Sequence, residues 1–214
     1  MNIILFGPPG AGKGTQGDYL EKNFNLIKIS TGDLLRNEIK KKSTLGNKIK
    51  STIDKGHFVS DNTVNELIKN AITEKKNFKK MIFDGYPRNI SQAEFLDHII
   101  KKSGQNISCV LNINVEQDVI IKRILGRQVC SNCGSIFNKF YNPATSDNHG
   151  CSAIYLKTRP DDTENTIKKR YKTYEKITLP IIKYYRNQNL LFEVNGMAEI
   201  IEINEEIAGL IKRL

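Results

Sequence analysis

Several features are absent from this 214-residue chain or scarce in it. No run approaches the roughly 18 consecutive apolar residues of a membrane-spanning helix, so we expect neither a membrane span nor a membrane partner. Residues 1–6 show no basic segment ahead of a long apolar stretch, so no secretory signal is indicated and we expect a cytoplasmic location. Internal repeats and low-complexity tracts are also absent. The remaining composition, 39% hydrophobic and 26% charged, is that of a folded protein with a sizeable core.

Cysteine is limited to four residues. Structural disulfides are not expected without a secretory signal, so metal binding must be considered instead. Cys109 lies within an apolar run and is most simply a buried strand thiol. The other three cysteines lie between residues 128 and 160, a stretch rich in Asn, Ser, Gly and Pro that is typical of a small inserted domain.

Acidic residues are too few to balance the basic ones, and the net charge is +10. This excess is compatible with nucleic acid, an anionic membrane or small anionic substrates. Arginine is the rarer of the two basic residues, and its planar guanidinium pairs with phosphate in a way that lysine cannot. The arginines are therefore the first candidates for ligand binding, and they stand at positions 36, 88, 123, 127, 159, 170, 186 and 213.

Short apolar runs alternate with helical patterns along the chain. These runs cover residues 2–6, 26–29, 81–83, 107–115 and 190–194. Such alternation predicts a parallel sheet with helices on both faces. Helix starts are predicted at a capping box formed by Ser91 and Glu94, and at Asp61 or Thr63.

The longest helical pattern covers residues 163–188. Its apolar stripe, which we expect to face the core, consists of Tyr171, Tyr174, Ile177, Ile181 and Tyr184. Pro180 lacks a backbone donor and should kink this helix.

The segment GPPGAGKGT, residues 7–15, follows a predicted strand and precedes a helix. Glycines allow backbone N–H groups to surround a phosphate, the helix N-terminus adds its positive dipole end, and Lys13 can reach the β and γ oxygens. The segment is therefore identified as a phosphate-binding loop. Gly14 stands where such loops usually place the Ser or Thr that binds magnesium, so that role is not assigned to Thr15.

A second predicted strand ends at the segment DGYPR, residues 84–88. Open α/β sheets bind ligands outside the carboxyl ends of their strands. Asp84 can hold magnesium through water there, and Arg88 can bind a phosphate. Asp84 capping a turn is the simpler alternative.

Cys130 and Cys133 have the spacing of a zinc knuckle, and Cys151 follows with His149 and Asp147 close by. Tetrahedral zinc accepts Cys, His or Asp ligands. We expect Cys130, Cys133, His149 and Cys151 to hold one structural zinc ion, with Asp147 as the substitute for the fourth ligand. The alternative is a segment held by hydrogen bonds and apolar contacts that only retains its cysteines.

Five ordered motifs give the whole chain a resemblance to the bacterial long-lid adenylate kinase family. They are residues 7–15, STGDLLR at 30–36, DGYPR at 84–88 with Gln92, ILGR at 124–127, and RPDD at 159–162 with Arg170. The resemblance implies a three-layer P-loop fold of the α/β class with a central parallel sheet. It also implies a core of residues 1–29, 60–125 and 163–214, a mobile monophosphate-binding segment at 30–59, and a lid at 126–162 in which Asp161 and Asp162 favour closure.

The same resemblance implies roles for individual residues. The expected ATP contacts are Gly10, Ala11, Gly12, Lys13, Gly14, Thr15, Arg123, Arg127, Ile136, Phe137 and Ala198. The expected AMP contacts are Thr31, Arg36, His57, Phe58, Val59, Gly85, Tyr86, Pro87, Arg88, Gln92, Arg159 and Arg170. The expected catalytic residues are Lys13, Asp84, Arg88, Arg123, Arg159 and Arg170. Arg123 and Arg127 are four residues apart, and we expect them on one face of a single helix.

These observations predict reversible, magnesium-dependent transfer of a phosphoryl group from ATP to AMP, giving two ADP, by a monomer that binds no nucleic acid. Another monophosphate kinase, acting on UMP or CMP, is the near alternative, although Gln92 and Thr31 favour adenine. A P-loop ATPase with a zinc-ribbon insert that binds nucleic acid is the alternative from another class, and it would need a basic patch interleaved with exposed aromatic residues.

Overall fold

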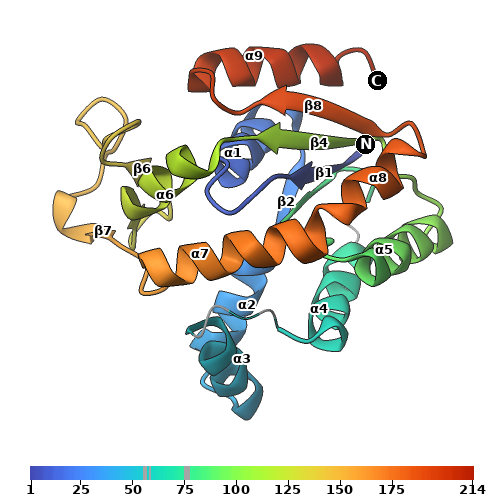
Figure 1. Ribbon diagram of the computed structural model, residues 1–214, viewed down its shortest axis with the longest axis horizontal. Coiled ribbons are helices and arrows are strands. Elements are labelled where there is room, and N and C mark those ends of the chain that lie inside the picture. The colour runs from blue at the N-terminus through green and yellow to red at the C-terminus, as the bar shows by residue number, and fades with distance from the viewer. Residues whose placement is uncertain (55–56, 58, 75–77) are drawn as a thin grey trace.

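A computed structural model describes residues 1–54, 57, 59–74 and 78–214 (Figure 1). The strands of its main sheet are β1 Asn2–Phe6, β2 Ile27–Ser30, β3 Met81–Asp84, β4 Cys109–Asn114 and β8 Leu191–Asn195. All neighbouring pairs are parallel, in the order β2-β3-β1-β4-β8. Each strand corresponds to one of the apolar runs, so the predicted parallel sheet is confirmed.

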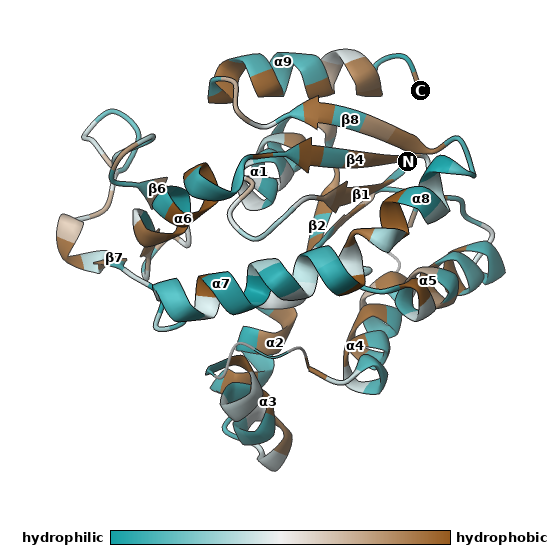
Figure 2. Cartoon of the chain, in the orientation of Figure 1, coloured by the Kyte–Doolittle hydropathy of each residue, from teal (hydrophilic) through white to brown (hydrophobic). Residues whose placement is uncertain are grey.

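Helices cover both faces of this sheet. The helices of the described residues are α1 Lys13–Phe24, α2 Thr31–Lys40, α3 Thr44–Asp54, α4 Asp61–Thr73, α5 Ile90–Lys102, α6 Gln117–Leu125, α7 Glu164–Thr173, α8 Pro180–Arg186 and α9 Ile200–Ile211, of which α3 packs on α2 away from the sheet. Leu20 of α1 and Ile207 of α9 are buried on one face, and Ile68 of α4 and Leu96 of α5 on the other. Burial of each such side chain stabilises the fold by about 1.5–3 kcal/mol relative to exposure. Figure 2 shows the apolar strands of the sheet enclosed between helices on its two faces, which confirms the predicted three-layer fold.

Cys109 lies at the start of β4 and is fully buried, as expected of a strand thiol. Burial raises the pKa of this thiol to about 12. Each helix within the described residues is too short or too polar to serve as a membrane span.

A second, antiparallel sheet occupies the inserted segment. Its strands are β5 Arg127–Cys130, β6 Ile136–Asn138 and β7 Leu156–Lys157, in the order β6-β5-β7, with the short 3₁₀ helix η2 Ala153–Tyr155 before β7. The expectation that Arg123 and Arg127 share a helix face is therefore wrong. The helix α6 ends at Leu125, Gly126 caps it, and Arg127 already belongs to β5.

Two predicted helix caps are also wrong. The side chain of Asn89 caps α5 by accepting a hydrogen bond from the backbone of Gln92, so the helix begins before the predicted box at Ser91. The cap residue of α4 is Ser60, and Asp61 is the first helical residue. The carboxylate of Asp61 instead accepts hydrogen bonds from the side chains of Asn89 and Gln92.

The long helical pattern is interrupted by a π-helical turn, η3 Tyr174–Thr178, between α7 and α8. In this turn the backbone N–H of Leu179 donates to the carbonyl of Tyr174, five residues back. One extra residue per turn shifts the stripe, so Thr178 is 6% exposed while Ile177 is 39% exposed. The placement of Ile177 in the core was therefore wrong. At Pro180, where a kink was predicted, the helix α8 begins, and Leu179 separates it from the π-helical turn.

Candidate functional site

A cavity of about 510 Å³ opens at the carboxyl ends of the parallel strands. Phe6, Ser30 and Asp84, which end β1, β2 and β3, all line it. Side chains from the second sheet, including Ile136 and Phe137 of β6, line the same cavity. Residues far apart in the sequence therefore surround one space at the position where open α/β sheets bind ligands.

The loop between β1 and α1 forms one wall of this cavity. Gly10 and Gly12 adopt positive φ angles of 83° and 95°, which favour glycine. A Cβ on Gly10 would also lie 2.7 Å from Ile124 Cγ1, so glycine allows α6 to approach the loop. The Nζ of Lys13 donates to the carbonyl oxygens of Gly7 at 2.7 Å and Pro8 at 2.8 Å. These features hold the ammonium at the N-terminus of α1, where an anion would bind.

Six of the arginines line the cavity: Arg36, Arg88, Arg123, Arg127, Arg159 and Arg170. Burial, and then repulsion from Arg170, lowers the pKa of Arg88 to about 10. Burial, and then repulsion from Arg127 and Arg36, lowers the pKa of Arg159 to about 10. Like charges gathered in this way disfavour one another until an anion neutralises them, so the arrangement suits a polyanionic ligand.

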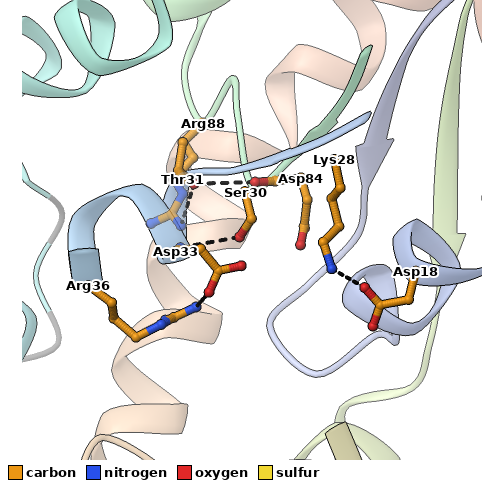
Figure 3. A network of polar contacts seen from close by, with 8 residues as sticks. All are labelled: Asp18, Lys28, Ser30, Thr31, Asp33, Arg36, Asp84 and Arg88. Atoms are coloured by element: carbon orange, nitrogen blue, oxygen red, sulfur yellow. Dashed lines mark hydrogen bonds and ion pairs between the residues drawn. The ribbon is translucent and has the colours of Figure 1, made fainter. Parts of the chain in front are cut away.

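Three of these arginines are paired with aspartates. Arg127 forms a two-pronged ion pair with Asp162, in which its Nε lies 2.8 Å from Oδ2, and the Asp162 side chain is fully buried. Arg170 pairs with Asp161 at 2.6 Å. Arg36 pairs with Asp33 at 2.5 Å (Figure 3). The carboxylates thus occupy positions that phosphate oxygens can take.

Asp84 lies at the centre of the polar network in Figure 3, at the end of β3. The hydroxyl of Thr31 donates to the carbonyl oxygen of Gly85 at 2.9 Å, which ties the start of α2 to this strand end. The side chains of Thr15, Asp33 and Asp84 line the same cavity as Lys13. Carboxylate and hydroxyl oxygens beside a phosphate-binding loop fit a magnesium ion that keeps most of its water ligands.

Not every predicted contact residue reaches this cavity. Tyr86 is buried in the core and donates its hydroxyl to Asn65 at 2.6 Å. Ala198 packs beside the core and is not among the lining residues. Gln92 lines a small neighbouring cavity with Thr31 and Arg88. Phe58 lies outside the described residues. The other predicted nucleotide contacts line the large cavity.

Gln92 is held by two hydrogen bonds. Its Oε1 accepts from the backbone N–H of Arg88 at 2.8 Å, and its Nε2 donates to Asp61 at 2.6 Å. These bonds orient the carboxamide beside the apolar side chains of Leu35, Val59 and Val64. This cavity of about 10 Å³ is too small for a base, so a base would reach the amide only after these side chains move apart.

Several lining residues were not identified from the sequence. They are Lys28, Asp33, Lys50, Asn138, Tyr141, Tyr174 and Thr178. The ring centroid of Tyr141 lies 5.5 Å from the Arg123 guanidinium carbon, a distance suited to a cation–π contact. The sequence signal for Lys28 was a charged residue in an apolar run that ends at the predicted ligand edge.

The predicted metal ligands are brought together in the second sheet. The ligand atoms of Cys130, Cys133, His149 and Cys151 lie within 4.8 Å of one another. Bonds of about 2.3 Å to sulfur and 2.0 Å to nitrogen place the corners of a tetrahedral zinc site roughly 3.5–4 Å apart, so a small contraction suffices. The Nε2 of His149 is buried and finds no hydrogen-bond partner in the described part of the chain. Asp147 is exposed and lies outside this cluster.

The chemistry of the donor set also fits a metal. Hydrogen bonds involving Ser135 lower the pKa of Cys133 to about 6, which favours the thiolate form that binds zinc. The Cys130 thiol, which is 1% exposed, lies at the end of β5, so a metal here would join β5 to the loop before β7.

The amino-acid sequence of this chain is similar to those of known proteins of one family. A family model described as adenylate kinase matches residues 5–190. The adenylate kinase of Pelagibacter ubique (strain HTCC1062) is 42% identical over 212 residues, which cover 99% of this chain and 100% of that protein. The adenylate kinases of Thermosipho melanesiensis and Methanocella arvoryzae are each 40% identical, over 215 and 216 residues, and both alignments cover 100% of both chains.

Proposed function

The chain belongs to the adenylate kinase family and is a phosphotransferase, and from this premise we propose how its residues carry out the transfer ATP + AMP ⇌ 2 ADP. ATP would bind the loop 7–15 with its phosphates at the N-terminus of α1. AMP would bind between α2 and the end of β3, with its base beside Gln92. The observation that carries this proposal is a single cavity lined by the phosphate-binding loop and six arginines.

Charge and position are the main catalytic devices in this proposal. Phosphoryl transfer proceeds through a transition state with charge spread over the equatorial oxygens, and little covalent help is needed from the protein. Lys13 would hold the β and γ oxygens of ATP, while Arg88 would hold the phosphate of AMP. Arg123, Arg159 and Arg170 would neutralise the charge of the group in transfer. Arg170 would release Asp161, and all of these groups would bind phosphate through charge-assisted hydrogen bonds.

Magnesium would be held by Asp84 through water, with Asp33 close by. When bound, it would neutralise charge on the ATP phosphates and fix their orientation. Gly14 leaves no hydroxyl directly after Lys13, and Thr15, which lines the cavity, is the hydroxyl available on that helix.

Water must be excluded, because water in the site would hydrolyse ATP. We propose that residues 126–162 act as a lid over ATP and residues 30–59 as a cover over AMP, with residues 1–29, 60–125 and 163–214 as the core. Support comes from the arginines of these segments, Arg36, Arg127 and Arg159, which all face the cavity. Closure would bring them onto the phosphates of both nucleotides.

A structural zinc ion would be held by Cys130, Cys133, His149 and Cys151. It would tie together a segment of short strands with few buried side chains. We also propose a monomer that acts in the cytoplasm without nucleic acid, as the family resemblance implies.

The experiment that tests this function is a coupled assay for ADP with ATP as donor and AMP, UMP, CMP or GMP as acceptor. We expect AMP to give the highest kcat/KM, because the oriented amide of Gln92 pairs with the donor and acceptor edge of adenine. A higher kcat/KM for UMP or CMP would show that this nucleotide, and not AMP, is the preferred acceptor. ATP hydrolysis that needs no monophosphate acceptor would overturn the transferase mechanism.

A further inference from the structure

Lys28 is a charged residue between two isoleucines in the strand β2. It lies on β2, and the register pairs it with Ile82 of β3, while Ser30 pairs with Asp84. Because paired residues of parallel strands share a face, Lys28 and Asp84 project from the same side of the sheet. That side is covered by α1, and Figure 3 shows the Lys28 side chain extending beside Asp84 toward Asp18 of α1. The family motifs do not include Lys28.

The charges around Lys28 are negative. Its ammonium forms an ion pair with Asp18 and lies close enough to Asp33 and Asp84 for both to act on it. Burial alone would lower the pKa of Lys28, but these three carboxylates raise it above the ordinary value. Lys28 therefore stays protonated and brings one positive charge to the edge of the cavity, which it lines together with Asp33 and Asp84.

The helix α1 is shaped to admit this side chain. A Cβ added to Gly17 would lie 2.7 Å from Cδ of Lys28, so the lysine stem passes over a position that only glycine leaves open. The Lys28 side chain is 15% exposed, whereas that of Lys41, which pairs with Glu38 on the surface, is 66% exposed. Lys28 is thus part of a built site and differs from the surface lysines.

We propose that Lys28 is a positioning residue that supplies positive charge among Asp18, Asp33 and Asp84, and so weakens the dependence of ATP binding on a divalent cation. The inference rests on the proposed function, in which this cavity binds ATP with magnesium. Without metal, the carboxylates of Asp33 and Asp84 would repel the phosphates of ATP. The ammonium of Lys28 offsets part of that repulsion.

Lys28 contributes less to ATP binding when magnesium accompanies the nucleotide. The metal itself neutralises the carboxylates, and its charge repels the ammonium, so loss of Lys28 would cost little. The two nucleotide forms therefore respond differently to Lys28, which is a coupling between metal and nucleotide binding. A lysine that only tied β2 to α1 through Asp18 would affect both forms equally.

The test measures the Kd of ATP by calorimetry in two buffers, one with EDTA and one with excess magnesium, for the wild type and Lys28→Gln. We expect Lys28→Gln to weaken ATP binding in EDTA by about five- to tenfold, as one charge at a screened distance of several ångströms implies. Binding with magnesium should change by less than about twofold. Lys28→Arg should restore the wild-type ratio. Lys41→Gln, which removes the same charge from an exposed pair, should alter neither Kd.

The variant Asp18→Asn separates the proposed charge role of Lys28 from a purely structural tie between β2 and α1. It breaks the tie between β2 and α1 but keeps the ammonium near Asp33 and Asp84, so we expect no loss of ATP binding in EDTA. Equal weakening by Lys28→Gln in both buffers, or an Asp18→Asn variant that reproduces Lys28→Gln, would overturn the inference. Wild-type protein that binds ATP in neither buffer would instead contradict the proposed function.

Discussion

Lys13 gives the site a pH dependence at the residue scale. Burial lowers the pKa of this lysine to about 8, and Asp84 only partly offsets the effect. Phosphate binding favours the ammonium form, so binding above pH 8 must take up a proton. Because phosphate groups are already ionised there, we expect ATP affinity to fall by roughly tenfold per pH unit as pH rises above about 8.

Calorimetry in buffers of different ionisation enthalpy measures this proton uptake directly. The uptake should approach one proton near pH 9 and disappear in Lys13→Met. The same uptake in Lys13→Met would assign the titration to another group.

Substitution of the two central cations should separate catalysis from folding. Lys13→Met and Arg88→Ala should each lower kcat by at least about 10²- to 10³-fold, because each removes charge aimed at the phosphoryl group. Both side chains line a cavity and not the apolar core, so circular dichroism should show a native fold. Arg186→Ala, at an exposed ion pair with Glu193, is the matched control and should keep wild-type kcat. A folded Arg88→Ala enzyme with near wild-type turnover would refute the role given to that arginine.

Residue identity predicted which side chains line the cavity well where the residue type is infrequent in the sequence. Arginine is infrequent here, and the six arginines expected to bind nucleotides all line the cavity. Lysine is frequent, so the place of Lys28 in an apolar run was a weak signal, and its contacts with Gly17 and Asp18 are visible only in the structure. Tyr86 was assigned by its place in a motif, yet packing turned its ring into the core.

At the scale of elements, the strands of the main sheet were predictable, whereas β5, β6 and β7 and the helix ends were not. A buried parallel strand shows itself as an apolar run, because both of its faces are covered. A helix end depends on which nearby polar side chain reaches a free backbone N–H, and at α5 that was Asn89 and not Ser91. The π turn before Pro180 has no such signature, so the predicted stripe was one residue out of phase at Ile177.

We expect the second sheet to depend on a zinc ion held by the Cys and His cluster. Elemental analysis of protein purified without chelator should give one zinc per chain, and Cys130→Ser with Cys133→Ser should abolish it. The melting temperature should fall, because β5 and β6 bury few apolar side chains of their own. AMP binding should change little, since its expected contacts other than Arg159 lie outside the inserted segment.

Cys109→Ala is the matched control for cysteine loss, because its thiol lies in the core and outside the cluster; it should retain one zinc per chain. Wild-type protein stripped of metal that melts at an unchanged temperature when zinc is returned would show that the four side chains hold no stabilising ion.

At the scale of the whole molecule, the proposed function places two nucleotide sites in one cavity. An analogue in which two adenosines are linked through five phosphates should therefore bind at least about 10²-fold more tightly than ATP, because the second site is engaged intramolecularly. Calorimetry with each ligand checks this ratio. Equal affinities would argue against a second site, and Arg36→Ala should weaken the linked analogue more than ATP.

The overall architecture followed from the order of the elements, because parallel strands with helical crossovers admit few topologies. The shared cavity did not follow from it. Arg127 and Arg159 come from the inserted segment, and their approach to Lys13 depends on how the second sheet packs against the core. Sequence spacing carries no information on that packing, and only the family resemblance anticipated it.

The aspartates that hold Arg127 and Arg170 have a consequence for selectivity among anions. Each carboxylate is tethered beside its guanidinium, so it competes with any incoming anion as though present at high local concentration. Inorganic phosphate offers the arginines nothing beyond its oxygens and must displace these internal competitors unaided. A nucleotide brings its base and ribose as well and displaces them readily. We therefore expect the ion pairs with Asp161 and Asp162 to disfavour the binding of free phosphate, so phosphate should inhibit the reaction only weakly.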